Sequence, residues 1–136
     1  MLKSPTKMEN KLKFLIIDDN EIDGLITAKL LEIHLQQTNV HYSESCEKGL
    51  EWIRTNRILD DETLIILLDI RMPDMDGFEF LGIIDKMDET LTKNIQVFML
   101  SSTLYAEDYQ LAEKNRFVKR LLSKPLPVKE LMGYIS

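Results

Sequence analysis

The chain has 136 residues, 44% of them hydrophobic, a net charge of −6 and one cysteine, Cys46. This length suits one compact domain, the acidic balance excludes the basic surface of a nucleic-acid-binding protein, and a lone cysteine excludes an intrachain disulfide or a multi-cysteine metal site. No apolar run reaches the roughly 18 residues of a membrane-spanning helix, so we expect a cytoplasmic protein that neither enters a membrane nor binds nucleic acid directly.

Residues 1–12 carry three lysines among Ser, Pro, Thr and Asn and show no hydrophobic period, so we expect a flexible tail. From residue 13 to residue 136, short apolar runs alternate with longer amphipathic segments. The predicted strands are 14–17, 40–43, 64–68, 95–100 and 117–122. The predicted helices are 21–35, 46–54, 78–87, 105–114 and 128–135. Five strand and helix pairs in succession predict one α/β domain around a parallel sheet.

The polarity of the strands predicts their order in the sheet. Central parallel strands are buried on both faces and read as continuous apolar runs, as 14–17, 64–68 and 97–100 do. The other two, 40–43 and 117–122, mix polar and apolar residues and suit the edges. The pattern predicts a doubly wound, five-stranded parallel sheet in the order 2-1-3-4-5 with five flanking helices.

Residue spacing predicts a buried face on two of the helices, and Asn20 is placed to cap the first turn of helix 21–35. The residues of these faces are Ile22, Leu25, Ile26 and Ile33 in the first helix and Leu104, Tyr109 and Leu111 in the fourth.

Polar side chains follow four of the strands. Asp18 and Asp19 follow the first and Asp69 the third, while Ser101 and Lys124 follow the fourth and fifth. Ligands of open α/β sheets bind beyond the carboxyl ends of the strands, where strands 1 and 3 lie about 4.8 Å apart. Three carboxylates crowded there repel one another, and a cation relieves the repulsion. Oxygen ligands of this kind favour Mg²⁺, with Mn²⁺ as a substitute.

Four short motifs together resemble the receiver domain of two-component response regulators, a family with a flavodoxin-like fold. The resemblance covers about residues 13–135, and the motifs occur in the family's order at similar separations. The motifs are Ile-Asp-Asp-Asn at 17–20, Asp-Ile-Arg-Met-Pro-Asp-Met-Asp-Gly at 69–77, Leu-Ser-Ser at 100–102 and Ser-Lys-Pro at 123–125.

The resemblance implies that Asp69 accepts a phosphoryl group from a phosphohistidine of a sensor histidine kinase or histidine phosphotransfer protein. The domain would be no enzyme beyond its own phosphorylation and slow autodephosphorylation. Asp18, Asp19, Asp69 and the main-chain carbonyl of Arg71 would hold Mg²⁺, and Lys124 would pair with the phosphoryl oxygens. Phosphoryl transfer depends mostly on positioning and charge neutralisation, which explains the need for these residue types.

The resemblance also implies a switch. The Ser101 hydroxyl would bond to the new phosphate and move the loop before helix 105–114, and Ser102 is small enough to leave room. The family signals through the surface that corresponds here to helix 105–114, strand 117–122 and helix 128–135.

The chain departs from the family at Leu121, three residues before Lys124, where receivers often carry a Tyr or Phe that reorients on activation. Tyr105, at the start of the fourth helix, is a hypothetical substitute. Arg71 stands at a variable position of the family, and we interpret it as a side chain that contacts the phosphate or shields it from water.

Each motif alone has an ordinary structural interpretation, because Asp-Asp pairs and serines often cap helices and Pro-x-x-x-Gly often forms a turn. An enzyme is the first alternative, since haloacid-dehalogenase-type phosphatases also place an Asp after an apolar strand. They carry a second Asp two residues later, where this chain has Arg71. A flavodoxin-like cofactor binder is disfavoured because no Ser/Thr- and Gly-rich loop follows strand 14–17.

The chain stops at Ser136 without an output domain, so we expect a stand-alone regulator that acts on an unknown downstream protein as a monomer or weak dimer. The alternatives are the receiver segment of a hybrid histidine kinase and a protein-interaction module that works without phosphorylation.

Overall fold

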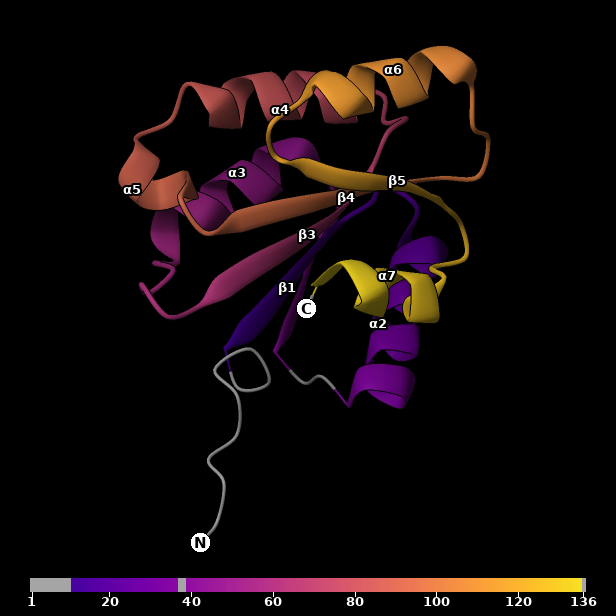
Figure 1. Ribbon diagram of the computed structural model, residues 1–136, viewed down its shortest axis with the longest axis horizontal. Coiled ribbons are helices and arrows are strands. Elements are labelled where there is room, and N and C mark those ends of the chain that lie inside the picture. The colour runs from indigo at the N-terminus through magenta and orange to yellow at the C-terminus, as the bar shows by residue number, and fades with distance from the viewer. Residues whose placement is uncertain (1–10, 37–38, 136) are drawn as a thin grey trace, which may run out of the picture.

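The computed structural model describes residues 11–36 and 39–135 (Figure 1). The strands are β1 (Leu12–Ile17), β2 (Val40–Ser43), β3 (Thr63–Asp69), β4 (Ile95–Ser101) and β5 (Val118–Ser123). The helices are α2 (Glu21–Leu35), α3 (Cys46–Thr55), α4 (Gly77–Asp85), α5 (Glu89–Thr92), α6 (Ala106–Lys114) and α7 (Val128–Ile135). Most of the predicted tail lies outside the described residues, and Leu12, its last residue, belongs to β1.

The five strands are parallel and follow the order β2-β1-β3-β4-β5, which confirms the predicted sheet and its two edge strands. Ile17 of β1 lies beside Leu68 of β3, and Asp69 of β3 lies beside Leu100 of β4. The carboxyl ends of the three central strands therefore meet at one edge of the sheet, where the predicted site residues follow them.

The described residues hold six helices, one more than predicted. The extra helix, α5, spans four residues and begins after Asp88, whose carboxylate accepts a hydrogen bond from the Thr90 amide at 2.9 Å. A single turn of helix is too short to show a hydrophobic period, so the sequence pattern misses it.

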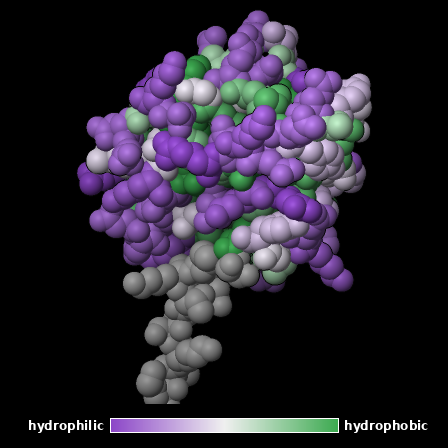
Figure 2. Space-filling model, turned by 45° about the horizontal axis from the view of Figure 1, so that its top comes forward, coloured by the Kyte–Doolittle hydropathy of each residue, from purple (hydrophilic) through white to green (hydrophobic). Residues whose placement is uncertain are grey.

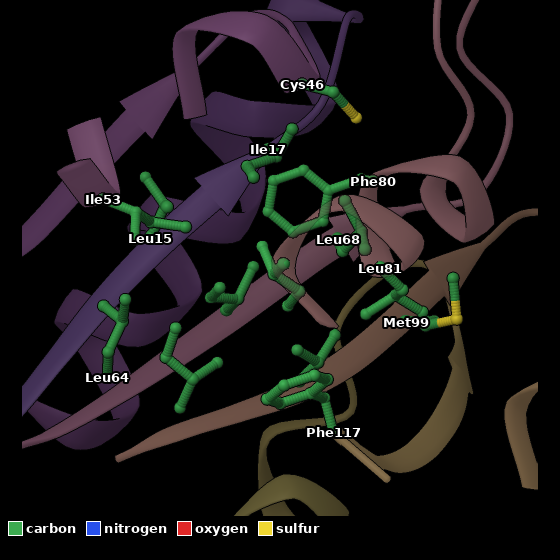
Figure 3. Close-up of a cluster of buried hydrophobic side chains, with 14 of the residues drawn as sticks. Leu15, Ile17, Cys46, Ile53, Leu64, Leu68, Phe80, Leu81, Met99 and Phe117 are labelled. Carbon is green, nitrogen blue, oxygen red and sulfur yellow. The ribbon is translucent and has the colours of Figure 1, made fainter. Parts of the chain in front are cut away.

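The core forms two layers, one on each face of the sheet. Helices α2 and α7 cover one face, and α3 and α4 cover the other, with α6 beside the edge strand β5 (Figure 1). Ile17 lies beside Phe80 of α4 and Leu15 beside Ile53 of α3 (Figure 3), whereas Phe14 and Ile16, their neighbours on β1, belong to the opposite layer. Burial on both faces explains why the central strands read as continuous apolar runs.

The predicted buried face of α2 is wrong. The helix turns Gly24, Thr27 and Leu31 inward, and a side chain at Gly24 would place its Cβ 2.4 Å from the Tyr42 ring. Gly24 and Thr27 therefore let α2 lie close to the sheet, and four of its larger apolar residues remain outside. The residues predicted as buried are Ile22, Leu25, Ile26 and Ile33, which are 69%, 60%, 44% and 59% exposed.

The predicted buried face of α6 is largely wrong as well. Tyr109 and Leu111 are 42% and 50% exposed, and only Leu104, before the helix, packs partly against the core. The two buried residues of α6 are Asp108 and Ala112. A helix beside the sheet edge buries only a narrow strip, so a spacing argument for a broad apolar face does not apply.

The surface is mostly hydrophilic on the face that Figure 2 shows, with hydrophobic patches between the polar side chains. No helix within residues 11–36 and 39–135 combines the length and the apolar character needed to cross a membrane.

Candidate functional site

Three carboxylates converge where β1 and β3 end. Asp18 and Asp19 follow β1 and Asp69 ends β3, and each offers an oxygen within 4.8 Å of the others. Asp18 and Asp69 are buried, whereas Asp19 is exposed. The structure thus brings together the predicted acidic cluster, with one carboxylate open to solvent.

Lys124 brings the opposite charge to this cluster from the end of β5. Its Nζ lies 2.8 Å from Asp18 Oδ2, 3.0 Å from Asp23 Oδ2 and 3.5 Å from Asp69 Oδ1. Its main-chain amide donates to the Ser101 carbonyl at 3.0 Å, and the peptide bond to Pro125 is cis. Lys124 therefore pairs with the carboxylates of this edge of the sheet, and its predicted pairing with phosphoryl oxygens stays a prediction.

Asp23 is a site residue that the sequence did not reveal. It lies in the first turn of α2, where an acidic residue is commonplace because it complements the helix dipole. Its amide donates to the Asn20 side chain at 3.0 Å, which confirms the predicted cap, and its carboxylate accepts from Lys124. Only the fold, which brings residues 23 and 124 together, distinguishes Asp23 from an ordinary first-turn acid.

Burial and neighbouring charge shift the ionisation of the site. Burial first, and the charge of Asp18 second, raise the pKa of Asp69 from 3.8 to about 6. Burial alone would lower the pKa of Lys124, but hydrogen bonds to Asp18 and Asp23 and the charge of Asp69 raise it overall. Lys124 therefore stays protonated, and the crowded carboxylates still hold more negative charge than one ammonium neutralises.

The backbone around the cluster is fixed by hydrogen bonds. Asp18 Oδ1 accepts from the Asn20 amide at 2.9 Å, and the Asp18 carbonyl accepts from the Tyr42 hydroxyl at 2.6 Å. Gly77, at the start of α4, donates its amide to the Ile70 carbonyl at 2.9 Å. A Cβ at Gly77 would lie 3.0 Å from the Asp69 carbonyl oxygen, so only glycine lets α4 begin this close to the end of β3.

Ser101 lies at the predicted place, but its hydroxyl is engaged elsewhere. Its Oγ donates to the Thr103 carbonyl at 2.6 Å and accepts from the Thr103 amide at 3.2 Å. Ser101 is buried, whereas the neighbouring Ser102 is exposed. A contact between Ser101 and a phosphate, as the resemblance implies, requires that this local turn rearrange.

The two switch candidates that carry large side chains differ in exposure. Leu121 is buried in the core layer that contains Met99 and Phe117, whereas Tyr105 is 51% exposed. Arg71 reaches Tyr105, with its guanidinium carbon 5.7 Å from the ring centre, and also binds Asp108. The side chain of Arg71 is therefore directed to α6; its main-chain carbonyl as a metal ligand stays a prediction.

The donor set suits a hard divalent cation. Carboxylate oxygens are the ligands that such ions prefer, and the charge that Lys124 leaves uncompensated would be offset by one. A cleft of about 110 Å³ opens beside Asp19, between residues 44–47 and 72–75, and gives the exposed carboxylate access to solvent.

Comparisons with known proteins agree with this geometry. The family model for the response regulator receiver domain matches residues 14–136. A response regulator receiver protein from Dyadobacter fermentans shares 32% identity and superposes with a TM-score of 0.81, covering 90% of this chain and 93% of that one. A two-component response regulator from Cytophaga hutchinsonii has the same fold, with 23% identity, a TM-score of 0.78 and coverage of 91% and 93%.

Two curated relatives from Dictyostelium discoideum are much longer proteins. Hybrid signal transduction histidine kinase G is 30% identical over 93% of this chain and 4% of that kinase. Hybrid signal transduction histidine kinase L is 28% identical over 98% of this chain and 8% of that kinase. The chain thus spans less than a tenth of the length of these relatives.

Proposed function

The chain belongs to the response regulator receiver domain family, and we propose that it is a phosphoryl-accepting switch of a two-component system with Asp69 as the acceptor. The observation that carries this proposal is the convergence of Asp69 with Asp18, Asp19 and Lys124 at the end of the central strands. These residues come from the ends of three strands, β1, β3 and β5, and together they would supply an acceptor, a cation site and a fixed positive charge.

The acceptor chemistry is a transfer from nitrogen to oxygen. An ionised Asp69 carboxylate oxygen forms a bond to phosphorus while the bond from phosphorus to the donor's histidine nitrogen breaks, and the nitrogen keeps the bonding electron pair. Lys124 lies within 3.5 Å of Asp69 Oδ1, so its ammonium is placed to neutralise charge on the transferred group. The buried position of Asp69 keeps competing water away, and the domain catalyses only its own phosphorylation and slow autodephosphorylation.

We assign the cation site to Asp18, Asp19 and Asp69, with the Arg71 main-chain carbonyl as a further ligand, and we propose Mg²⁺ with Mn²⁺ as a substitute. When bound, the ion neutralises negative charge between the acceptor and the incoming phosphoryl oxygens. Burial first, and the charge of Asp18 second, raise the pKa of Asp69 to about 6, and a nearby divalent cation would favour its ionised form.

The donor is a sensor histidine kinase or a histidine phosphotransfer protein, and the product state acts on a downstream protein through α6, β5 and α7. We propose a cytoplasmic domain that is a monomer or weak dimer, consistent with its acidic charge and small size. Both relatives from Dictyostelium discoideum are hybrid histidine kinases, which favours a second candidate, the receiver segment of such a kinase. The stand-alone regulator expected from the sequence stays a prediction.

Intact mass after incubation with Mg²⁺ and phosphoramidate, a small donor with the P–N bond of phosphohistidine, tests the proposal. We expect one added phosphoryl group in the wild type and in Asp74→Asn, which removes an exposed carboxylate from the same loop. Asp69→Asn and a sample with chelator should gain none. If neither phosphoramidate nor beryllofluoride formed an adduct with the wild type, the chain would instead be an interaction module that works without phosphorylation.

A further inference from the structure

An ion pair joins the acceptor loop to α6. Arg71, two residues after Asp69, donates from Nη2 to both carboxylate oxygens of Asp108, at 2.9 and 2.7 Å. The Asp108 side chain is only 3% exposed, whereas that of Arg71 is 52% exposed. Within the part of the chain that the structure describes, Arg71 is the only side chain that donates to the Asp108 carboxylate, so α6 depends on it to compensate a buried charge.

Helix α6 has few other attachments. Ala112 is its only buried apolar residue, and Tyr105, at its N-cap, makes no side-chain capping hydrogen bond. The Arg71 guanidinium also lies over the Tyr105 ring. Arg71 thus contacts Asp108 in the first turn of α6 and Tyr105 at its cap. A side chain that begins two residues after Asp69 therefore helps to hold α6 in place.

We propose that Arg71 is shared between two anions, Asp108 in the unphosphorylated protein and the phosphoryl group on Asp69 in the phosphorylated one, and that its transfer releases α6. This inference rests on the proposed function, and it names the regulation of that same site. Only Ile70, which is fully buried, separates Asp69 from Arg71 in the sequence, so the Arg71 side chain begins close to the proposed acceptor.

Charge and geometry favour the transfer. A phosphoryl group carries about −1.5 to −2 charges and three acceptor oxygens, which exceeds the single charge of Asp108. A guanidinium matches phosphate geometry with two parallel hydrogen bonds, while the competing cation Lys124 already faces three carboxylates. A hollow of about 610 Å³, bordered by Arg71, Phe78, Tyr105, Asp108 and Leu111 among others, leaves the guanidinium room to move.

If Asp108 and the phosphoryl group compete for Arg71, substituting Arg71 and substituting Asp108 should change the affinity for beryllofluoride in opposite directions. In 19F NMR titrations of bound beryllofluoride, Arg71→Gln should weaken binding about tenfold, because a charge-assisted hydrogen bond to the phosphoryl mimic is lost. Asp108→Asn should tighten binding about threefold, because Arg71 no longer has to leave a carboxylate. The double variant should behave like Arg71→Gln.

Two matched controls separate competition from general electrostatics and from loss of an arginine. Glu107→Gln removes the same charge from an exposed neighbour of Asp108 and should change binding much less than Asp108→Asn. Arg116→Gln breaks a different arginine–carboxylate pair, between Arg116 and Asp85, in which both side chains are exposed. This variant should leave beryllofluoride binding unchanged. If Asp108→Asn fails to fold, Arg71→Gln still tests whether Arg71 binds the phosphoryl mimic, because a half-exposed side chain can be replaced with little effect on folding.

Amide hydrogen exchange of α6 gives the second readout. We expect exchange about tenfold faster in Asp108→Asn without beryllofluoride and in the wild type with it. If Asp108→Asn weakened binding as Arg71→Gln does, the pair would be merely structural and the inference would be overturned. A wild-type adduct with unchanged α6 exchange would overturn the inference and leave the proposed function standing, and the absence of any adduct would overturn both.

Discussion

Asp69 carries a conflict between function and stability. Its carboxyl is buried beside Asp18, and its pKa of about 6 means that ionisation is disfavoured in the folded protein. Phosphoryl transfer requires the ionised carboxylate, which is the form that the fold disfavours without a cation. The ionised site is therefore destabilised by repulsion between its carboxylates, and a bound cation would reduce that repulsion.

Asp69→Asn should stabilise the cation-free protein at pH 7. Between pH 4 and 6 the folded state keeps a proton that the unfolded state has lost, so stability falls as pH rises through this window, and the full cost is present above about pH 6. An amide cannot ionise, so we expect the variant to gain roughly 1–3 kcal/mol in free energy of unfolding at pH 7, with the gain shrinking toward zero near pH 4.

Urea unfolding in chelator at both pH values measures this gain. Asp74→Asn, in the same loop but exposed, should change the free energy of unfolding by less than about 0.5 kcal/mol at either pH. A wild type that is more stable than Asp69→Asn at pH 7 would show that Asp69 is stabilised, not strained, in its ionised form.

The two glycines of α4 should respond to alanine in opposite directions. A Cβ at Gly77 would lie 2.8 Å from Met99 Cε and 3.0 Å from the Asp69 carbonyl, so Gly77→Ala should destabilise the protein by about 1–3 kcal/mol. Gly82 has no atom within 4 Å of an added Cβ, and Gly82→Ala should stabilise the helix by about 0.5–1 kcal/mol. Thermal or urea unfolding of both variants tests the pair, and equal effects would contradict the close approach of α4 to Asp69.

Helix α2 shows how far a sequence pattern predicts an element. Its bounds and its Asn20 cap agree with prediction, because local capping and breaking signals set them. Its inward face could not be predicted, because apolar residues occur all around the helix and spacing then selects no single stripe. The decisive contact, Gly24 against Tyr42, joins two elements and exists only in the fold.

Alanine substitution of two leucines in α2 tests the observed face. Leu31 is fully buried in the layer with Phe14, so Leu31→Ala should cost about 2–5 kcal/mol of free energy of unfolding. Leu25 is 60% exposed, and Leu25→Ala should cost less than about 0.5 kcal/mol. If Leu25→Ala were as costly as Leu31→Ala, the helix would be rotated from its position in the structure.

The exposed side of α2 carries four large apolar residues, Ile22, Leu25, Ile26 and Ile33, and the helix begins just after Asp18 and Asp19. Exposed apolar patches are typical of protein contact sites. Exposed apolar residues on this helix are consistent with a proposed function in which another protein delivers the phosphoryl group.

The whole domain was more predictable than its helix faces. Strand polarity predicts the sheet order because burial on two faces leaves no polar position in a strand, and carboxylates at strand ends predict the cluster because parallel strands end together. Side-chain pairings between distant segments were not predictable. Asp108 in α6 looks like an ordinary first-turn acid in the sequence, yet it pairs with Arg71. The local bond from the Ser101 hydroxyl to the Thr103 carbonyl was not predictable from the sequence either.

Locating the phosphoryl group on the chain tests the proposed acceptor most directly. After phosphorylation with Mg²⁺ and phosphoramidate, borohydride converts an acyl phosphate of aspartate to homoserine, and peptide mass spectrometry identifies the converted residue. We expect homoserine at position 69 alone, with none in samples that contain chelator. Conversion at Asp18 or Asp19, or a phosphoryl group that borohydride leaves in place on another residue type, would contradict Asp69 as the acceptor.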